Sequence, residues 1–183
     1  MSKRLLLLDR DGTLIREPAN FQIDSFEKLS FLPGVIGALR RLVAAGYTPV
    51  MVTNQDRLGT PHWPEAQFWP IQRFVVDLLA GEGIVFEAIF IDNHTPEDNH
   101  PNRKPGTGML TGYLSDPAVD WQHSYVVGDR QTDARLAQNL GCHSLTIHDP
   151  QSHNADLLQG TPQHAPTTVF TTWQALADYL LAR

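Results

Sequence analysis

Two aspartates stand directly after the most apolar segment near the start of the chain. Asp9 and Asp11 follow the uninterrupted leucine run Leu5–Leu8. A short apolar run of this kind is typical of a strand buried on both faces, as in a parallel sheet. Side chains two residues apart in an extended chain point to the same side, so both carboxylates are predicted to face one crevice. Such a pair favours a bound cation, and a free carboxylate can also attack phosphorus covalently.

Three further groups of polar residues are predicted to share that crevice. They are Thr53 and Asn54 at the end of the apolar segment 48–53, Arg103 and Lys104 in a polar loop, and Asp129 and Asp133 after the segment 124–127. In a parallel sheet the carboxyl ends of the strands meet at one edge, where ligands bind. Carboxylate oxygens suit Mg²⁺, while the cationic, hydroxyl and amide groups suit phosphoryl oxygens. The inventory therefore predicts phosphoryl transfer.

The elements that must position these groups follow from the apolar periodicity. Strands are predicted at 5–8, 48–53, 84–91, 124–127, 143–147 and 167–170, and helices at 33–46, 65–79, 106–114, 132–140 and 173–181. Strands and helices alternate, which is typical of an α/β fold with a mostly parallel sheet and helices on both faces. The segments 95–105 and 149–166 are rich in Pro, His, Asn, Asp and Gln and are predicted to be loops.

The bulk composition narrows the class of protein. The 183 residues include 42% hydrophobic side chains, enough for a core, and we expect a single domain over residues 1–183. A formal net charge of −6 gives no basic surface for nucleic acid. The apolar run after Arg4 is too short for a signal peptide or a membrane span, so a cytoplasmic protein is expected. The single cysteine, Cys142, excludes an internal disulfide and a metal site built from several thiolates.

Each short motif is weak by itself, and the order of the motifs carries the prediction. Asp-Gly, Thr-Asn and Gly-Asp pairs are common in turns, and a lone lysine is usually a solvated surface charge. Four motifs in succession at predicted strand ends resemble those of phosphatases of the haloacid dehalogenase (HAD) superfamily. They are Asp9-x-Asp11-Gly12-Thr13, Thr53-Asn54, Lys104, and Gly128-Asp129 with Asp133. The resemblance implies a Rossmann-like three-layer sandwich, and the short segment between the first two motifs leaves no room for a large cap domain.

The resemblance also implies a role for each matching residue. Asp9 would attack phosphorus and form an aspartyl-phosphate, and Asp11 would protonate the leaving alkoxide and then activate water. Mg²⁺ would be bound by Asp9, Asp129 and the backbone carbonyl of Asp11. Thr53, Asn54 and Lys104 would bind the phosphoryl oxygens. Thr13 and Asp133 would lie behind the metal-binding and phosphate-binding residues and orient them.

Longer segments resemble the histidinol-phosphatase branch of this superfamily, including the phosphatase domain of the bifunctional histidine-biosynthesis enzyme. The resemblance covers about residues 7–147, and its most specific part is the segment 54–60. It implies hydrolysis of L-histidinol phosphate, which carries an ammonium group and an imidazole, and Glu17 and Arg103 are candidate contacts to this substrate. Two alternatives stay open: a phosphatase of heptose bisphosphate or another small phosphomonoester, and a catalytically silent module that binds phosphate esters. The complete set of motif residues speaks against the silent module.

The chain departs from the family pattern at two places. Relatives often bind zinc through Cys-x-His and Cys-x-Cys before an Arg-Lys-Pro element, whereas the matching residues here are Asp92, His94, His100 and Asn102. Three thiolates are missing and a neutral amide is present, so we expect no tight structural zinc and predict a loop ordered by hydrogen bonds. Arg57 takes a position where many relatives carry glycine. Its side chain either stands in solvent, which we favour, or adds positive charge near the phosphate.

Overall fold

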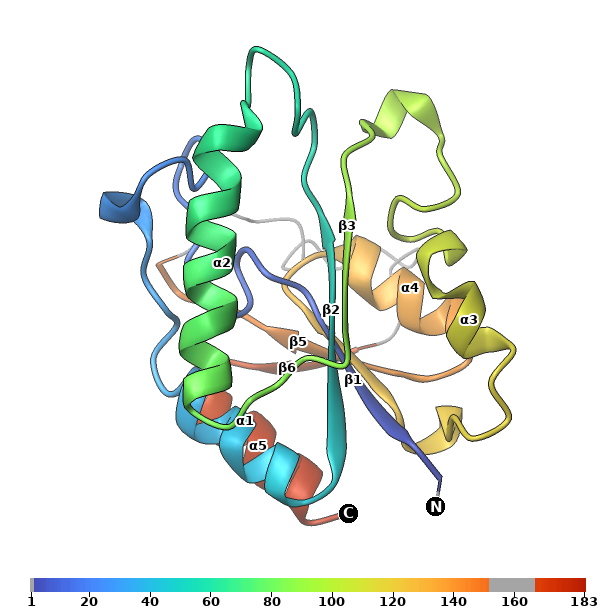
Figure 1. Ribbon diagram of the computed structural model, residues 1–183. Helices are drawn as coiled ribbons and strands as arrows, with labels where there is room; N and C mark the ends of the chain where they lie inside the picture. Colours follow the sequence, from blue (N-terminus) through green and yellow to red (C-terminus); the bar gives the residue numbers. More distant parts are fainter. Residues whose placement is uncertain (1, 152–166) are drawn as a thin grey trace.

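The computed structural model describes residues 2–151 and 167–183. At its centre is a six-stranded sheet, in which every strand is parallel to its neighbours. The strands are β1 (Arg4–Leu8), β2 (Tyr47–Asn54), β3 (Ala88–Asp92), β4 (Tyr125–Gly128), β5 (His143–Ile147) and β6 (Thr168–Phe170). The α-helices are α1 (Val35–Ala44), α2 (Glu65–Gly81), α3 (Thr111–Leu114), α4 (Gln131–Leu140) and α5 (Trp173–Leu181). Their alternation confirms the predicted α/β fold (Figure 1).

The strand order creates the crevice in which the predicted motifs meet. The order is β3-β2-β1-β4-β5-β6, so the chain moves outward from β1 to β3 and then continues on the other side of β1 with β4. Leu8 at the end of β1 is therefore in register with Met51 on one side and with Val127 on the other. Where such an order reverses, the loops after the two strands diverge and leave a crevice at their carboxyl ends. Asp9 and Asp129 directly follow the two strands that flank this reversal.

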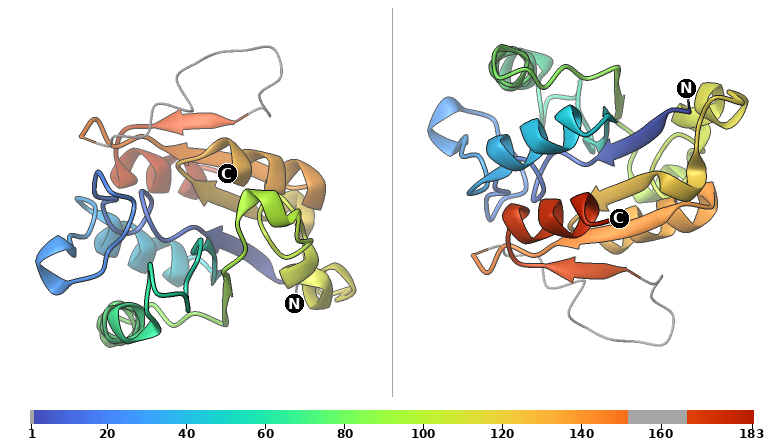
Figure 2. Two further views of the ribbon diagram at one scale, coloured as in Figure 1. Left: turned by 90° about the horizontal axis from the view of Figure 1, so that it is seen from above. Right: turned by 90° about the horizontal axis from the view of Figure 1, so that it is seen from below.

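Alternate side chains of β1 pack into two separate cores. Leu6 and Leu8 are fully buried in the core that α1, α2 and α5 cover, whereas Leu5 and Leu7 are fully buried in the core beside α3 and α4. Successive side chains of a strand point to opposite faces, so a strand covered on both faces needs an unbroken apolar run. Figure 2 shows the sheet between these two helical layers. The close packing holds in place the backbone that leads into Asp9.

Two elements are shorter than the apolar pattern predicts. β3 begins at Ala88 rather than at Ile84, because the Ile84 N–H donates to the Leu79 carbonyl (2.9 Å) and so closes the end of α2. The predicted helix 106–114 consists of a 3₁₀ turn at Gly108–Leu110 and the four-residue α3. In both places apolar side chains are buried in the core although their backbone does not form the predicted strand or helix.

The connecting segments agree with the prediction where they are described. The segment 95–105 is a loop with one 3₁₀ turn at Pro96–Asp98, whereas residues 152–166 of the predicted loop 149–166 lie outside the described residues. Between β1 and α1 the chain forms loops and a 3₁₀ turn at Phe26–Lys28, so no large cap domain is inserted there.

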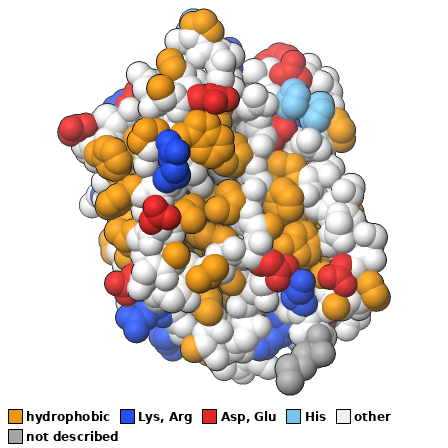
Figure 3. All heavy atoms as spheres, viewed as in Figure 1, with side chains coloured by type: hydrophobic (Ala, Val, Ile, Leu, Met, Phe, Trp, Pro, Cys, Tyr) orange, Lys and Arg blue, Asp and Glu red, His pale blue; other side chains and the backbone are white. Residues whose placement is uncertain are grey.

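The molecular surface is partly apolar beside the edge strand β3. Ile89 on β3 is 37% exposed and Phe74 on α2 is 46% exposed. Figure 3 shows apolar side chains gathered over these two elements on the viewed face. The outer edge of β3 therefore lies close to solvent. Among the described residues, no helix has both the length and the apolar character needed to cross a membrane.

Candidate active site

The structure brings most of the predicted site residues to one pocket of about 460 Å³ at the carboxyl ends of β1 and β2. A pocket of this volume suits a small molecule. The predicted residues that line it are Asp9, Asp11, Glu17, Thr53, Asn54, Arg103 and Lys104. Asp129 and Asp133 lie buried beside Asp9, and Thr13 is fully buried behind the loop.

A buried ion-pair cluster occupies the floor of this pocket. The Lys104 Nζ lies 2.9 Å from Asp9 Oδ1 and 2.7 Å from Asp133 Oδ1, and the lysine side chain is 2% exposed. Burial works against the ammonium, but Asp133 and then Asp9 hold the pKa of Lys104 above its ordinary value. Asp9 Oδ1 also accepts the Arg10 backbone N–H at 2.7 Å, whereas Asp9 Oδ2 accepts no hydrogen bond among the described residues. One oxygen of the predicted nucleophile is thus fixed and the other is available.

Three carboxylates of the cluster suit a hard divalent cation. Ligand oxygens of Asp9, Asp129 and Asp133 lie within 4.8 Å of one another, and all three residues are buried. Burial, and then the charges of Asp9 and Asp133, raise the pKa of Asp129 well above its ordinary value. A cation among these oxygens relieves the repulsion, and Mg²⁺ prefers carboxylate ligands. Gly12 (φ +73°) permits the close approach of the loop, since a Cβ there would lie 2.2 Å from Asp129 Oδ2.

Asp133 is engaged by the protein itself on both of its oxygens. Oδ1 pairs with Lys104, and Oδ2 accepts the Arg130 backbone N–H (3.1 Å) at the start of α4. Burial raises the pKa of Asp133 to about 6, with Lys104 acting against the shift. These contacts favour an orienting role for Asp133 over direct metal binding.

Two donors to which the sequence analysis assigned no role hold Asp11. Arg10 Nη1 lies 2.6 Å from Asp11 Oδ1, and Gln55 Nε2 lies 2.7 Å from Asp11 Oδ2. Arg10 is fully buried, with its guanidinium 5.0 Å from the centre of the Phe68 ring. Gln55 also donates to Thr53 Oγ1 at 2.8 Å and so joins the first two motifs. Arginine and glutamine are mostly exposed in proteins, so nothing in the sequence indicates that these two are buried.

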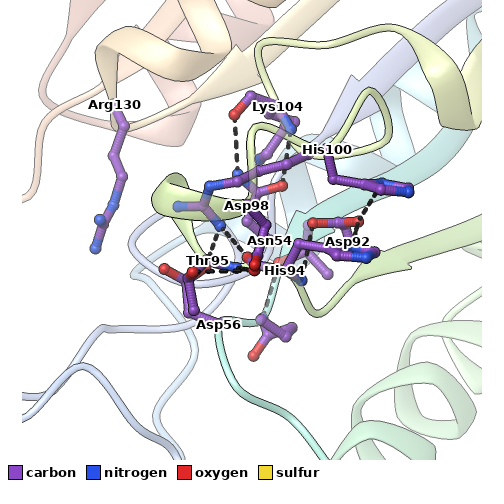
Figure 4. A network of polar contacts seen from close by, with 12 residues as sticks. Asn54, Asp56, Asp92, His94, Thr95, Asp98, His100, Lys104 and Arg130 are labelled. Atoms are coloured by element: carbon purple, nitrogen blue, oxygen red, sulfur yellow. Dashed lines mark hydrogen bonds and ion pairs between the residues drawn. The ribbon is translucent and has the colours of Figure 1, made fainter.

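Asn54 fixes the backbone that carries Lys104. The Asn54 Oδ1 accepts the Lys104 N–H at 3.0 Å, and its Nδ2 donates to the Lys104 carbonyl at 3.2 Å (Figure 4). The paired contacts tie the end of β2 to the loop 95–105. Asn54 therefore positions Lys104, in addition to its predicted role at the phosphate.

Two of the arginines that line the pocket, Arg130 and Arg103, are paired with carboxylates. Arg130 Nη2 lies 2.6 and 2.7 Å from the two oxygens of Glu17, which is 7% exposed. Burial raises the pKa of Glu17 although Arg130 acts against the shift. Arg103 forms an ion pair with Asp56, a residue of the segment 54–60 to which the sequence analysis assigned no role. Glu17 and Arg103 thus line the pocket as predicted, but each already has a partner.

Arg57 has an exposed side chain and also lines the same pocket, so its position is compatible with both alternatives given for it. Its backbone φ of +65° lies in the left-handed region that favours glycine. A residue in this conformation could be replaced by glycine without backbone strain.

The loop that replaces the zinc-binding segment is closed by hydrogen bonds and ring stacking. Ligand atoms of Asp92, His94 and His100 lie within 4.8 Å of one another, which by itself would suit a metal. The two imidazoles, however, stack at 3.6 Å with an angle of 7° between their planes. An imidazole nitrogen offers its lone pair in the ring plane, and one ion cannot lie in two parallel planes so far apart. In addition, His94 Nδ1 lies 2.8 Å from Asp92 Oδ1 (Figure 4). His100 Nδ1 accepts the Asn102 N–H at 3.3 Å. The arrangement therefore does not fit zinc.

The carboxyl-terminal helix supports the first motif from behind. The Trp173 indole N–H donates to the Thr13 carbonyl at 2.9 Å, and both residues are buried. This contact favours the predicted orienting role of Thr13. Its partner lies 160 residues away in sequence, so no local pattern identifies it.

Comparison with known proteins identifies the family. The model of HAD-hydrolase-like proteins matches residues 101–176. One similar solved structure is the crystal structure of D,D-heptose 1,7-bisphosphate phosphatase from B. bronchiseptica in complex with magnesium and phosphate. The two sequences are 32% identical, the match covers 98% of each chain, and the structures superpose with a TM-score of 0.81. The chain belongs to the HAD-like hydrolases. The predicted HAD-like fold and family are therefore confirmed.

Curated relatives of this HAD-like chain carry a name from histidine biosynthesis. The histidine biosynthesis bifunctional protein HisB of Bacteroides fragilis is 44% identical over the whole chain, and that of Legionella pneumophila is 49% identical over 79% of it. The chain spans 48% and 41% of the length of these relatives, about half.

Proposed function

We propose that the chain hydrolyses L-histidinol phosphate to L-histidinol and inorganic phosphate through an aspartyl-phosphate at Asp9. The observation that carries the proposal is the buried cluster in which Lys104 holds one oxygen of Asp9 beside Asp129 and Asp133. Buried carboxylates cost free energy and repel a phosphate, so a module that only binds phosphate esters gains nothing from them. A phosphatase uses them as nucleophile, acid and metal ligands.

The chemistry follows from the positions of the side chains. Asp9 Oδ2 attacks phosphorus, so that a bond from Asp9 to phosphorus forms as the ester P–O bond breaks. Asp11 gives its proton to the departing alkoxide, and as the carboxylate it then takes a proton from the water that hydrolyses the aspartyl-phosphate. The Thr53 hydroxyl, Asn54 and the Lys104 ammonium stabilise the phosphoryl oxygens during both steps.

Mg²⁺ is the cation that we propose for this site, held by Asp9, Asp129 and the backbone carbonyl of Asp11. When bound, it supplies positive charge to the phosphoryl group and to the nucleophilic carboxylate. The magnesium and phosphate in the B. bronchiseptica structure support this choice.

Two carboxylates at the pocket mouth, Glu17 and Asp56, favour a leaving group that carries a cation. Arg130 and Arg103 already pair with Glu17 and Asp56, so a second phosphate must displace a carboxylate to reach either guanidinium. The ammonium or imidazolium of histidinol phosphate can instead approach these carboxylates. The name shared by the relatives at 44–49% identity also supports this substrate.

The test is phosphate release from L-histidinol phosphate, D,D-heptose 1,7-bisphosphate and p-nitrophenyl phosphate with Mg²⁺, beside an Asp9→Asn control. We expect the highest kcat/KM for histidinol phosphate and no turnover by the control. Glu17→Gln should weaken selection of histidinol phosphate over p-nitrophenyl phosphate, because the second ester carries no cation.

The other outcomes separate the alternatives. Turnover that favours heptose bisphosphate and needs Asp9 would keep the chemistry and overturn the substrate. Binding of phosphate without turnover of any ester would instead support the silent module.

A further inference from the structure

We propose that Gln55 is a positioning residue that holds the Asp11 carboxylate and directs the Thr53 hydroxyl toward the phosphoryl group. The inference rests on the proposed phosphatase function, because it assigns a task within that site. Gln55 is 1% exposed, although it follows the end of β2 directly and lines the pocket. A buried amide is costly unless its polar atoms serve as partners of other groups.

The backbone around Gln55 leaves little freedom for its side chain. The Gln55 N–H donates to the Asp92 carbonyl at 2.6 Å, which extends the pairing of β2 with β3 by one residue. The backbone from which the Gln55 side chain extends is therefore held in place.

The two N–H groups of the Gln55 amide reach two different motifs. Nε2 lies 2.7 Å from Asp11 Oδ2 and 2.8 Å from Thr53 Oγ1. The amide thus presents its nitrogen, and not its oxygen, to both residues. Its two N–H groups can serve two acceptors at once.

This orientation decides where the Thr53 proton points. A hydroxyl group has one proton to donate and two lone pairs that accept. Since Thr53 Oγ1 accepts from Gln55, its own proton is directed away from Gln55. Thr53 lines the pocket that, under the proposed function, would hold phosphoryl oxygens in need of a donor. Gln55 thereby converts a hydroxyl that could point either way into a fixed donor.

The same amide completes the grip on Asp11. Arg10 Nη1 holds Oδ1 at 2.6 Å, and Gln55 holds Oδ2, so the carboxylate is fixed in its plane from both ends. Hydrogen bonds to a charged group are stronger than neutral ones, and misplacing a catalytic group by about 1 Å can cost a hundredfold in rate. Loss of Gln55 should therefore lower kcat by about tenfold to a hundredfold.

The experiment compares Gln55→Met with Gln72→Met. Methionine keeps the length of the side chain and removes its donors. Gln72 is the matched control, because it is also a buried glutamine (3% exposed) but donates to Met51 Sδ and does not belong to the pocket lining. We measure kcat and KM with L-histidinol phosphate and p-nitrophenyl phosphate, thermal unfolding, and binding of inorganic phosphate with Mg²⁺ by calorimetry.

We expect Gln55→Met to lower kcat for both esters and to weaken phosphate binding severalfold, while Gln72→Met changes neither. In a Thr53→Val background, Gln55→Met should no longer weaken phosphate binding, because the hydroxyl that it orients is gone. A merely structural role would leave the two effects additive.

The proposal is overturned if folded Gln55→Met keeps wild-type kcat and phosphate affinity. It is also overturned if both glutamine variants lose activity in proportion to their loss of thermal stability. If histidinol phosphate is not turned over by the wild type, the substrate assignment fails, and p-nitrophenyl phosphate and phosphate binding still test Gln55.

Discussion

Replacing Lys104 by methionine removes the cation that the cluster of buried carboxylates shares. The Lys104 Nζ lies 2.9 Å from Asp9 and 2.7 Å from Asp133, and Asp129 lies within the same group. Removing one partner of a buried ion pair costs about 3–5 kcal/mol. We take about 3 kcal/mol, the lower end of that range, because Asp133 (pKa about 6) can take up a proton in the variant. For a domain of this size that free energy lowers Tm by roughly 6–12 °C.

The assay is thermal unfolding of metal-free protein at pH 7.5, followed by addition of Mg²⁺. Magnesium should restore more stability to Lys104→Met than to the wild type, because a divalent cation relieves the repulsion that the variant exposes. Lys28→Met is the control, since Lys28 pairs with Asp24 at 2.7 Å on the surface, with 34% of its side chain exposed. Loss of such a surface pair should cost at most about 1 kcal/mol.

Two results would refute this reasoning. One is an equal fall in Tm for Lys104→Met and Lys28→Met in metal-free buffer. The other is a destabilised Lys104→Met that gains no more from Mg²⁺ than the wild type does, because the carboxylates would then not be the source of the loss.

Three further predictions concern pH, backbone strain and metal content. In metal-free buffer, Asp133 should lower the stability by about 3 kcal/mol between pH 4 and pH 6, because its pKa is about 6 in the native protein and 3.8 in the unfolded chain, so the native protein holds this proton more tightly. Urea unfolding at several pH values tests this, and Asp133→Asn should flatten the slope. Arg57→Gly should raise the free energy of unfolding by roughly 0.5–1 kcal/mol, because glycine adopts φ +65° without strain, and a lower Tm would contradict this. Elemental analysis of the purified wild type should find less than one zinc ion per chain. The triple variant Asp92→Cys, His100→Cys and Asn102→Cys should bind one zinc ion. One zinc ion per chain in the wild type would contradict the prediction.

Much of the fold could be predicted from the sequence because its signals are local. The run Leu5–Leu8 predicts a strand covered on both faces, and alternation of strands and helices then predicts a parallel sheet. A parallel sheet brings strand ends to one edge, so the positions of Asp9, Thr53 and Asp129 near one crevice also follow. Prediction from the sequence fails where one residue fits two structures. The apolar side chain of Ile84 fits a strand, but its N–H closes the end of α2.

The tertiary structure alone decided the contacts among these residues. Whether Glu17 is free or paired depends on Arg130, which is 113 residues away, and the support of Thr13 by Trp173 spans 160 residues. Burial of Arg10 and Gln55 likewise depends on the packing of distant elements, since the residue type alone favours exposure. Sequence spacing therefore fixes which side chains arrive at the crevice, because strand geometry is local. Their partners and charges are set by the whole fold, because hydrogen bonds and desolvation depend on three-dimensional neighbours.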